Sequence, residues 1–182
     1  MGLQIDLLPD FVKKIKDNKT CFVKKFTTFE KIYDFNSLLD YIEKNDPHIN
    51  PKNNGDFFKA VFQLKQLEDQ FDDFKFYQNF LREVFKYKVH EKDGCDVFFS
   101  FKSGSGNSHI DEEDVFIIGL NGKTLYKVFE DSTKYYEIDK GDMIFIPKGT
   151  PHKVRSLSSR IILSVGFFGK NDWLLPIDRL NL

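Results

Sequence analysis

Two short motifs carry most of the chemical information in this chain. The first is His109-Ile110-Asp111, and the second is the stretch GDMIFIPKGTPH, which ends at His152. Two imidazoles and one carboxylate on one face of an octahedral ion leave the other face open, which is the ligand set of non-haem Fe(II) oxygenases. Four thiolate or imidazole donors would instead favour a closed, structural zinc site. The residue types therefore predict a catalytic metal centre and oxidative chemistry.

The predicted elements must bring these three side chains together. If His109 and Asp111 lie on a strand, both point to the same side, because residues two apart share a face. His152 must then arrive from a different strand, after a run of proline and glycine that restricts the backbone. Each motif alone also fits a chance His-x-Asp or a strand, a turn and a surface histidine. Their order on a β-rich half favours the metal site.

Other ionisable residues near these motifs have simpler interpretations. His48 and His90 lie in helical or loop surroundings, and we expect both to be surface or capping residues. Glu112, Glu113 and Asp114 are expected to form a solvated acidic turn, although the parity of Glu113 directs it inward.

Composition sets broad limits on function. The 182 residues fit one domain, and 27 basic against 28 acidic residues give a net charge of −1. We therefore expect no nucleic-acid or membrane partner. Cys21 and Cys95 lie far apart without CxxC pairing, which argues against a disulfide scaffold or a zinc knuckle. The N-terminus shows neither a signal peptide nor a membrane span, so a cytoplasmic location is predicted.

The first half of the chain has mainly helical periodicity. Apolar spacing predicts four helices, with their apolar positions at 7–15, 35–42, 57–67 and 76–85. A strand is expected at 21–26 and a loop at 50–55, and the second helix should stop near Asp46-Pro47.

From Cys95 onward the pattern changes to short β-rich runs. The six clearest strands are 96–102, 114–120, 123–129, 134–139, 142–147 and 160–168. Asn121-Gly122 indicates a hairpin, and Lys140-Gly141-Asp142 a second turn. Many short strands at this spacing favour a mainly β fold with N-terminal helices, a double-stranded β-helix of the cupin or jelly-roll type.

We expect one domain over residues 1–182. It would comprise a helical cover with its first strand (1–90), the double-stranded β-helix core (91–170) and a C-terminal tail (171–182). The tail, with Trp173 and its leucines, is expected to pack on the body or, as the alternative, on a partner.

Three segments resemble a known family. SGSGNSHIDEEDVFIIGLNGKTLYKV, GDMIFIPKGTPHKV and SRIILSVGFF are similar to the catalytic core of cupin-like Jumonji C oxygenases, closest to the ribosomal-oxygenase branch. Upstream, DFVKKIKDNKTCFVKKF resembles the first helix and strand of that branch. The resemblance does not extend to its C-terminal dimerisation region and winged-helix domain. It implies that His109, Asp111 and His152 bind Fe(II), and that 2-oxoglutarate and O₂ are consumed to give succinate, CO₂ and a hydroxylated product.

One position departs from the family pattern. The family has Lys or Arg thirteen residues after the triad aspartate, where it pairs with the far carboxylate of 2-oxoglutarate, and this chain has Thr124. The adjacent Lys123 should point outward by strand alternation. A buried carboxylate needs a cationic or hydrogen-bonding partner, so another residue must serve if 2-oxoglutarate binds. Arg160, in phase with Ser164, is the preferred candidate and Lys102 the second.

Hydroxyl groups complete the predicted co-substrate site. Thr124 and Tyr126 could donate hydrogen bonds into the pocket. The sequence as a whole predicts an Fe(II)- and 2-oxoglutarate-dependent oxygenase that hydroxylates an amino-acid-derived group, in a free amino acid, a peptide or a protein. Two alternatives stay open: a metal-dependent cupin enzyme that does not use 2-oxoglutarate, either a substrate-chelating dioxygenase or an isomerase, and a non-catalytic metal-binding cupin module.

Overall fold

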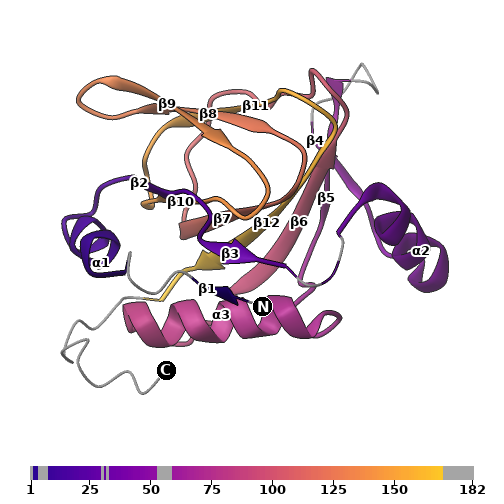
Figure 1. The fold of residues 1–182 in the computed structure, drawn as a ribbon, viewed down its shortest axis with the longest axis horizontal. Helices are drawn as coiled ribbons and strands as arrows, with labels where there is room; N and C mark the ends of the chain where they lie inside the picture. The colour runs from indigo at the N-terminus through magenta and orange to yellow at the C-terminus, as the bar shows by residue number, and fades with distance from the viewer. Residues whose placement is uncertain (1, 4–7, 30, 32, 53–58, 170–182) are drawn as a thin grey trace.

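The fold is taken from a computed structural model that describes residues 2–3, 8–29, 31, 33–52 and 59–169. Two β-sheets face each other over these residues, and helices pack outside the larger sheet (Figure 1). None of the helices in this part of the chain has the length and apolar character needed to cross a membrane. The expected packing of the 171–182 tail lies outside the described residues.

The larger sheet has seven strands, and the helices pack against its outer face. Its strand order is β2-β10-β7-β12-β6-β5-β4, and every neighbouring pair is antiparallel. In that order the strands are Cys21–Val23, Met143–Ile146, Asp114–Asn121, Arg160–Phe167, Gly94–Ser100, Val61–Leu64 and Asn50–Lys52. The central strands are apolar on both faces, as expected of strands covered on both sides.

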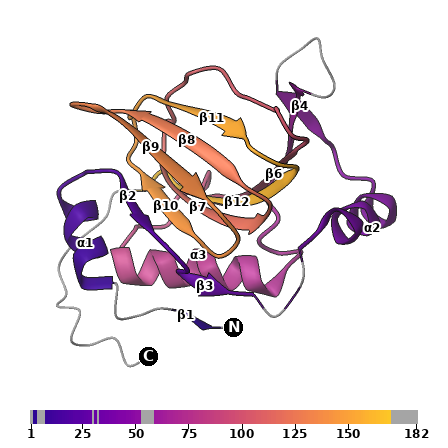
Figure 2. The same cartoon turned by 45° about the horizontal axis from the view of Figure 1, so that its top comes forward.

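The smaller sheet closes the barrel over the inner face of the larger one (Figure 2). It pairs β8 (Thr124–Phe129) with both β9 (Thr133–Ile138) and β11 (His152–Ser156). Isolated bridges Ser105↔Arg155 and His109↔His152 join the segment before β7 to the free side of β11. This segment takes the place of a fourth strand, so the metal-site motif lies at the edge of the smaller sheet.

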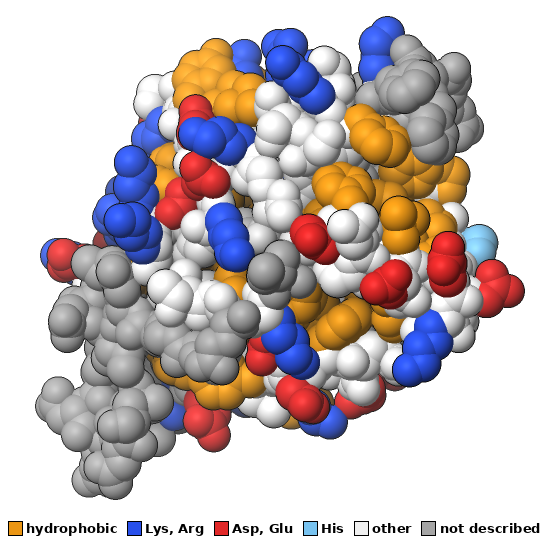
Figure 3. Space-filling view, turned by 45° about the vertical axis from the view of Figure 1, so that its right-hand side comes forward, with side chains coloured by type: hydrophobic (Ala, Val, Ile, Leu, Met, Phe, Trp, Pro, Cys, Tyr) orange, Lys and Arg blue, Asp and Glu red, His pale blue; other side chains and the backbone are white. Residues whose placement is uncertain are grey.

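The helices and two hydrophobic clusters hold the sheets together. One cluster fills the barrel between the sheets, and the other packs the outer face of the larger sheet against α1 (Leu8–Lys16) and α3 (Asp72–Phe85). Helix α3 runs along the larger sheet, and α2 (Phe35–Asn45) lies at the side of the sheet near β5 (Figure 1). The space-filling view turned toward α2 shows hydrophobic side chains between scattered charges of both signs (Figure 3).

Sequence periodicity predicted most of these elements. All six strands expected after Cys95 are present, and α1, α2 and α3 occupy three of the four expected helical segments. Helix α2 stops at Asp46, which adopts a left-handed C-cap conformation with φ 43°. The mainly β class is confirmed, and a short edge pair, β1 (Gly2–Leu3) with β3 (Thr27–Thr28), adds to it.

Three local predictions were wrong. The third helix expected at 57–67 is instead strand β5, because Val61 and Leu64 become buried against β6. Part of the expected loop at 50–55 forms the edge strand β4 beside β5. A hairpin was also expected at Asn121-Gly122, but β7 and β8 belong to different sheets. Gly122 does adopt φ 68°, and its turn carries the chain from one sheet to the other.

Candidate metal centre and its cavity

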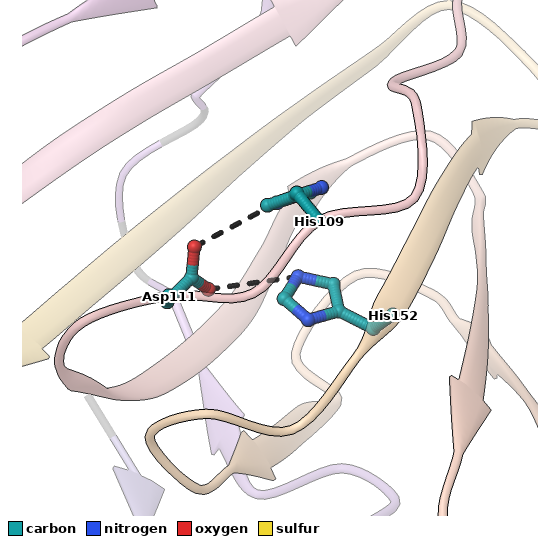
Figure 4. A group of neighbouring side chains, drawn as sticks. All are labelled: His109, Asp111 and His152. Atoms are coloured by element: carbon teal, nitrogen blue, oxygen red, sulfur yellow. Dashed lines mark ion pairs between the residues drawn. The ribbon is translucent and has the colours of Figure 1, made fainter.

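Three side chains from the two motifs meet at the mouth of the barrel. One candidate ligand atom from each of His109, Asp111 and His152 lies within 4.8 Å of the others (Figure 4). The two carboxylate oxygens of Asp111 lie 3.7 Å from His109 Nε2 and 3.5 Å from His152 Nε2. The donor set and its convergence fit a divalent metal with open coordination positions.

The backbone holds the two histidines opposite each other. His109 and His152 form a reciprocal pair in which each amide donates to the other's carbonyl, both at 2.9 Å. Contrary to the prediction, His109 and Asp111 do not lie on a regular strand; isolated bridges to β11 and a hydrogen bond from Gly149 N to the Asp111 carbonyl oxygen hold this segment. The convergence of the ligands therefore depends on β11 and on the loop that precedes it.

Hydrogen bonds set the tautomer of both imidazoles. His109 Nδ1 lies 2.9 Å from the carbonyl oxygen of Asn107, and His152 Nδ1 lies 3.1 Å from that of Thr150. A carbonyl only accepts, so each neutral ring carries its proton on Nδ1. The Nε2 lone pairs are then free to bind a metal, as in other histidine metal sites.

Burial also favours the metal-binding form of His152. Its side chain is 2% exposed, and desolvation lowers its pKa although the nearby Asp111 carboxylate raises it. The neutral imidazole that a metal requires is therefore favoured at neutral pH.

The three residues line a cavity of about 430 Å³ inside the barrel. Tyr126, Arg160 and Ser164 line the same cavity. A pocket of this size with a few convergent polar groups is typical of small-molecule and cofactor sites.

Arg160 is a buried cation that lines the same cavity. Its side chain is 1% exposed, and its Nε donates to Ser100 Oγ at 3.1 Å and Ser156 Oγ at 2.8 Å. The Tyr126 phenol also interacts with it, and burial lowers the pKa of the guanidinium. No carboxylate within the described part of the chain forms an ion pair with Arg160. A buried guanidinium without an ion-pair partner lowers the stability of the fold, unless an anion enters the cavity and pairs with it.

The hydroxyl groups predicted for the co-substrate site cluster around Arg160. Thr124 is buried, and its Oγ1 accepts from Arg160 Nη1 at a long 3.4 Å. Tyr126 is fully buried, and desolvation raises its pKa to about 12 despite the opposing effect of Arg160. Lys123 points outward as expected and pairs with Glu137 at 3.0 Å.

Lys102 is not where the prediction required it. Strand β6 ends at Ser100, and the chain then turns through Ser103, which has φ 78°. Lys102 is exposed in this turn and is not among the residues that line the cavity. The strand expected over 96–102 ends at Ser100, before Lys102, so Arg160 is the candidate that the structure brings to the cavity.

The cavity also has an acceptor-rich part that the sequence did not reveal. Gln63 Nε2 donates to Asp96 Oδ2 at 2.6 Å, while Gln63 Oε1 is buried and has no hydrogen-bond partner among the described residues. Asp96 lies directly across from Ser164 in the β6–β12 register, and Ser100 across from Arg160. Arg160 and Ser164 are four residues apart on β12. The cationic part of the cavity around Arg160 is therefore about 13 Å from the acceptor-rich part around Asp96.

The other ionisable residues behave largely as expected. His48 and His90 are exposed, as is Glu112. Glu113 lines the cavity, in agreement with its inward parity, and burial and then the Asp111 charge raise its pKa. Gln63 gave no signal, because its segment had helical rather than strand periodicity.

Comparisons with solved structures show which proteins share this architecture. The ribosomal oxygenase YcfD from Escherichia coli, in complex with cobalt and 2-oxoglutarate, superposes with a TM-score of 0.74 at 20% identity over 93% of this chain and 53% of that chain. A prolyl-4-hydroxylase from Pseudomonas putida superposes with a TM-score of 0.67 at 11% identity, over 88% and 98% of the two chains. The chain has the fold of the 2-oxoglutarate oxygenases.

Sequence similarity points in the same direction over a shorter stretch. The ribosomal protein uL16 3-hydroxylase of Escherichia coli (strain K12) is 29% identical over 98 residues, which are 43% of this chain and 26% of that protein. No protein-family model matches the chain. The resemblance to a ribosomal-oxygenase core is thus confirmed by the fold and by a local sequence match. The structural match spans about half the length of YcfD, and the sequence match spans about a quarter of the curated relative.

Proposed function

We propose that this protein is an Fe(II)- and 2-oxoglutarate-dependent oxygenase that hydroxylates an amino-acid-derived side chain. The proposal rests on the presence, in one cavity, of a group that can bind the metal and a group that can bind a carboxylate of the co-substrate. The cavity is lined by a His-Asp-His group able to hold a metal, and by a buried Arg160 that forms no ion pair with a carboxylate in the described part of the chain. An iron ion bound by His109, Asp111 and His152 would supply the oxidising chemistry.

The chain's own residues would bind and orient the co-substrate. Arg160 would meet the far carboxylate of 2-oxoglutarate, with Thr124 and Tyr126 beside it. The hydroxyl groups of Ser100 and Ser156 accept from Nε and so fix the guanidinium, whose Nη groups would meet the ligand. In this way Arg160 would replace the lysine or arginine that the family places at the Thr124 position.

The acceptor-rich part of the cavity favours a substrate that donates hydrogen bonds. A side chain bearing N–H groups or positive charge would bind here to Asp96, Glu113 and the buried Gln63 Oε1. The curated relative acts on a ribosomal protein, as its name states. We propose a peptide or protein side chain as the substrate here, and a cytoplasmic location for the reaction.

The test is an anaerobic titration with Fe(II) and then 2-oxoglutarate. A weak metal-to-ligand charge-transfer band in the visible should appear with the wild type and be absent in His152→Ala. No band at millimolar 2-oxoglutarate, with iron bound, would favour a cupin enzyme that chelates its own substrate or an isomerase.

Turnover is tested separately in air. Succinate should form from 2-oxoglutarate, faster with basic peptides than with matched acidic peptides. A protein that binds iron and 2-oxoglutarate but forms no succinate with a broad amino-acid and peptide panel would be a non-catalytic binding module.

A further inference from the structure

We infer that Asp114 and Tyr87 are positioning residues for the metal centre, which act by holding the loop that delivers His152. This inference rests on the proposed metal site. Neither residue belongs to the group of candidate ligands, and both lie where the helical cover meets the start of β7.

The loop between β10 and β11 is attached at two points to the segment that carries Asp111. Gly149 N donates to the carbonyl oxygen of Asp111 at 2.9 Å, and Lys148 N donates to Asp114 Oδ1 at 2.8 Å. Asp114 follows Asp111 by three residues, and Gly149 precedes His152 by three. The two hydrogen bonds therefore fix the separation between the second and third ligands.

Tyr87 holds the Asp114 carboxylate in the orientation that this contact needs. Its buried phenol donates to Asp114 Oδ2 at 2.7 Å, so each carboxylate oxygen has its own donor. The Tyr87 ring is itself fixed, since it stacks on Phe167 at 4.4 Å with an interplanar angle of 7°. Burial, followed by the charge of Asp114, raises the pKa of Tyr87, so the phenol keeps the proton it donates.

The rest of the loop is held by its own turn and by β8: Thr150 N donates to the Pro147 carbonyl oxygen at 3.1 Å, and Phe129 N to that of Pro151 at 2.9 Å. The loop forms no helix or strand between Ile146 and His152, and Gly149 adopts φ 77°. A hydrogen bond to a carboxylate is stronger than one to a neutral group, particularly where water is partly excluded. Because β11 pairing holds His152 itself, loss of the Asp114 contact should loosen the spacing between the Asp111 segment and the loop before His152, and so weaken metal binding.

The chain supplies a matched control for this arrangement. Tyr33 is a second buried tyrosine, and its phenol donates to Asp73 Oδ2 at 2.5 Å. Asp73 lies in the first turn of α3, outside the candidate ligands and the loop that precedes His152. Tyr33→Phe and Asp73→Ala remove the same kind of interaction without touching the metal centre.

The experiment measures Co(II) affinity from the absorption of the bound ion, with folding checked by circular dichroism. We expect Asp114→Ala to weaken Co(II) binding about 10- to 100-fold, the range for residues that orient metal ligands, and Tyr87→Phe to weaken it about tenfold. Asp114→Asn should bind within about threefold of wild type, since its amide can accept from Lys148 and donate to the phenol oxygen. Tyr33→Phe and Asp73→Ala should leave the affinity within about twofold.

Each outcome decides the inference. Equal Co(II) affinity in Asp114→Ala and Asp73→Ala would overturn it, as would failure of Asp114→Asn to restore binding. If Asp114→Ala does not fold, Tyr87→Phe decides in the same way against Tyr33→Phe. A wild-type protein whose Co(II) binding is unchanged in His152→Ala would overturn the proposed function together with the inference.

Discussion

Replacement of Arg160 should separate the needs of folding from those of co-substrate binding. The guanidinium is buried and bonded to Ser100, Ser156 and Thr124, yet no described carboxylate neutralises it. Methionine resembles the apolar stem of arginine and has no charge, so Arg160→Met removes the cation and keeps most of the stem's packing. The two serine hydroxyls lie 2.6 Å apart and still bond each other when the arginine is gone.

The two expected effects differ in size. Three hydrogen bonds of about 1 kcal/mol each are lost, but the desolvation cost of a buried cation, several kcal/mol, is lost as well. The free energy of unfolding without co-substrate should therefore change little or rise. Truncating one partner of a buried charge pair costs about 2–5 kcal/mol in binding. At about 1.4 kcal/mol per tenfold, the 2-oxoglutarate affinity should fall by about 30-fold to several thousand-fold.

Two measurements on the same preparation test this reasoning. Urea denaturation gives the stability, and anaerobic titration of the Fe(II) protein with 2-oxoglutarate gives the affinity from the charge-transfer band. Fe(II) binding itself serves as the control and should stay close to wild type. Unchanged 2-oxoglutarate affinity combined with a loss of more than about 3 kcal/mol of stability would show that Arg160 is a structural residue, and would refute the assignment.

Three further predictions follow from the geometry. Asp111→Ala should abolish metal binding and turnover while the melting temperature of the apoprotein stays close to wild type, because a ligand at a partly open site is removed rather than core volume; calorimetry and metal titration check this. Burial lowers the pKa of His152, so the unfolded chain binds a proton at this imidazole more readily than the folded chain does. The stability of the apoprotein should therefore fall as the pH drops below about 6.5. Urea denaturation at a series of pH values should show a weaker fall in His152→Asn. Gly119→Ala places a Cβ 2.1 Å from the Asp139 carbonyl oxygen and should lower the free energy of unfolding by about 3 kcal/mol. In Gly106→Ala the new Cβ meets nothing within 4 Å, so the loss should stay under about 0.5 kcal/mol. Equal denaturation midpoints for the two variants would contradict this.

The sequence predicted the metal motif and most strands, because the residue types of a motif and the alternation within a strand are visible over a few neighbouring positions. Alternation placed Thr124 inward and Lys123 outward, as the structure confirms. The phase of the last strand directed Arg160 and Ser164 toward one cavity. The six strands were recognised because β-branched and aromatic runs alternate with clear turn signals.

Features that depend on distant parts of the chain were not predictable in this way. The apolar spacing around Val61 fits a helix locally, but pairing with β6 makes that segment a strand. The same error hid Gln63, whose side chain reaches the cavity only because β5 joins the larger sheet. Asn121-Gly122 marked a turn correctly, but no local signal shows that the turn links two sheets rather than two paired strands.

The most direct test of the account is a crystal structure of the protein with Mn(II) and an unreactive analogue of 2-oxoglutarate. We predict that Mn(II) is bound by His109, Asp111 and His152, and that the far carboxylate of the analogue meets the Arg160 guanidinium. A metal bound elsewhere, or an analogue whose far carboxylate lies away from Arg160, would contradict the central claim.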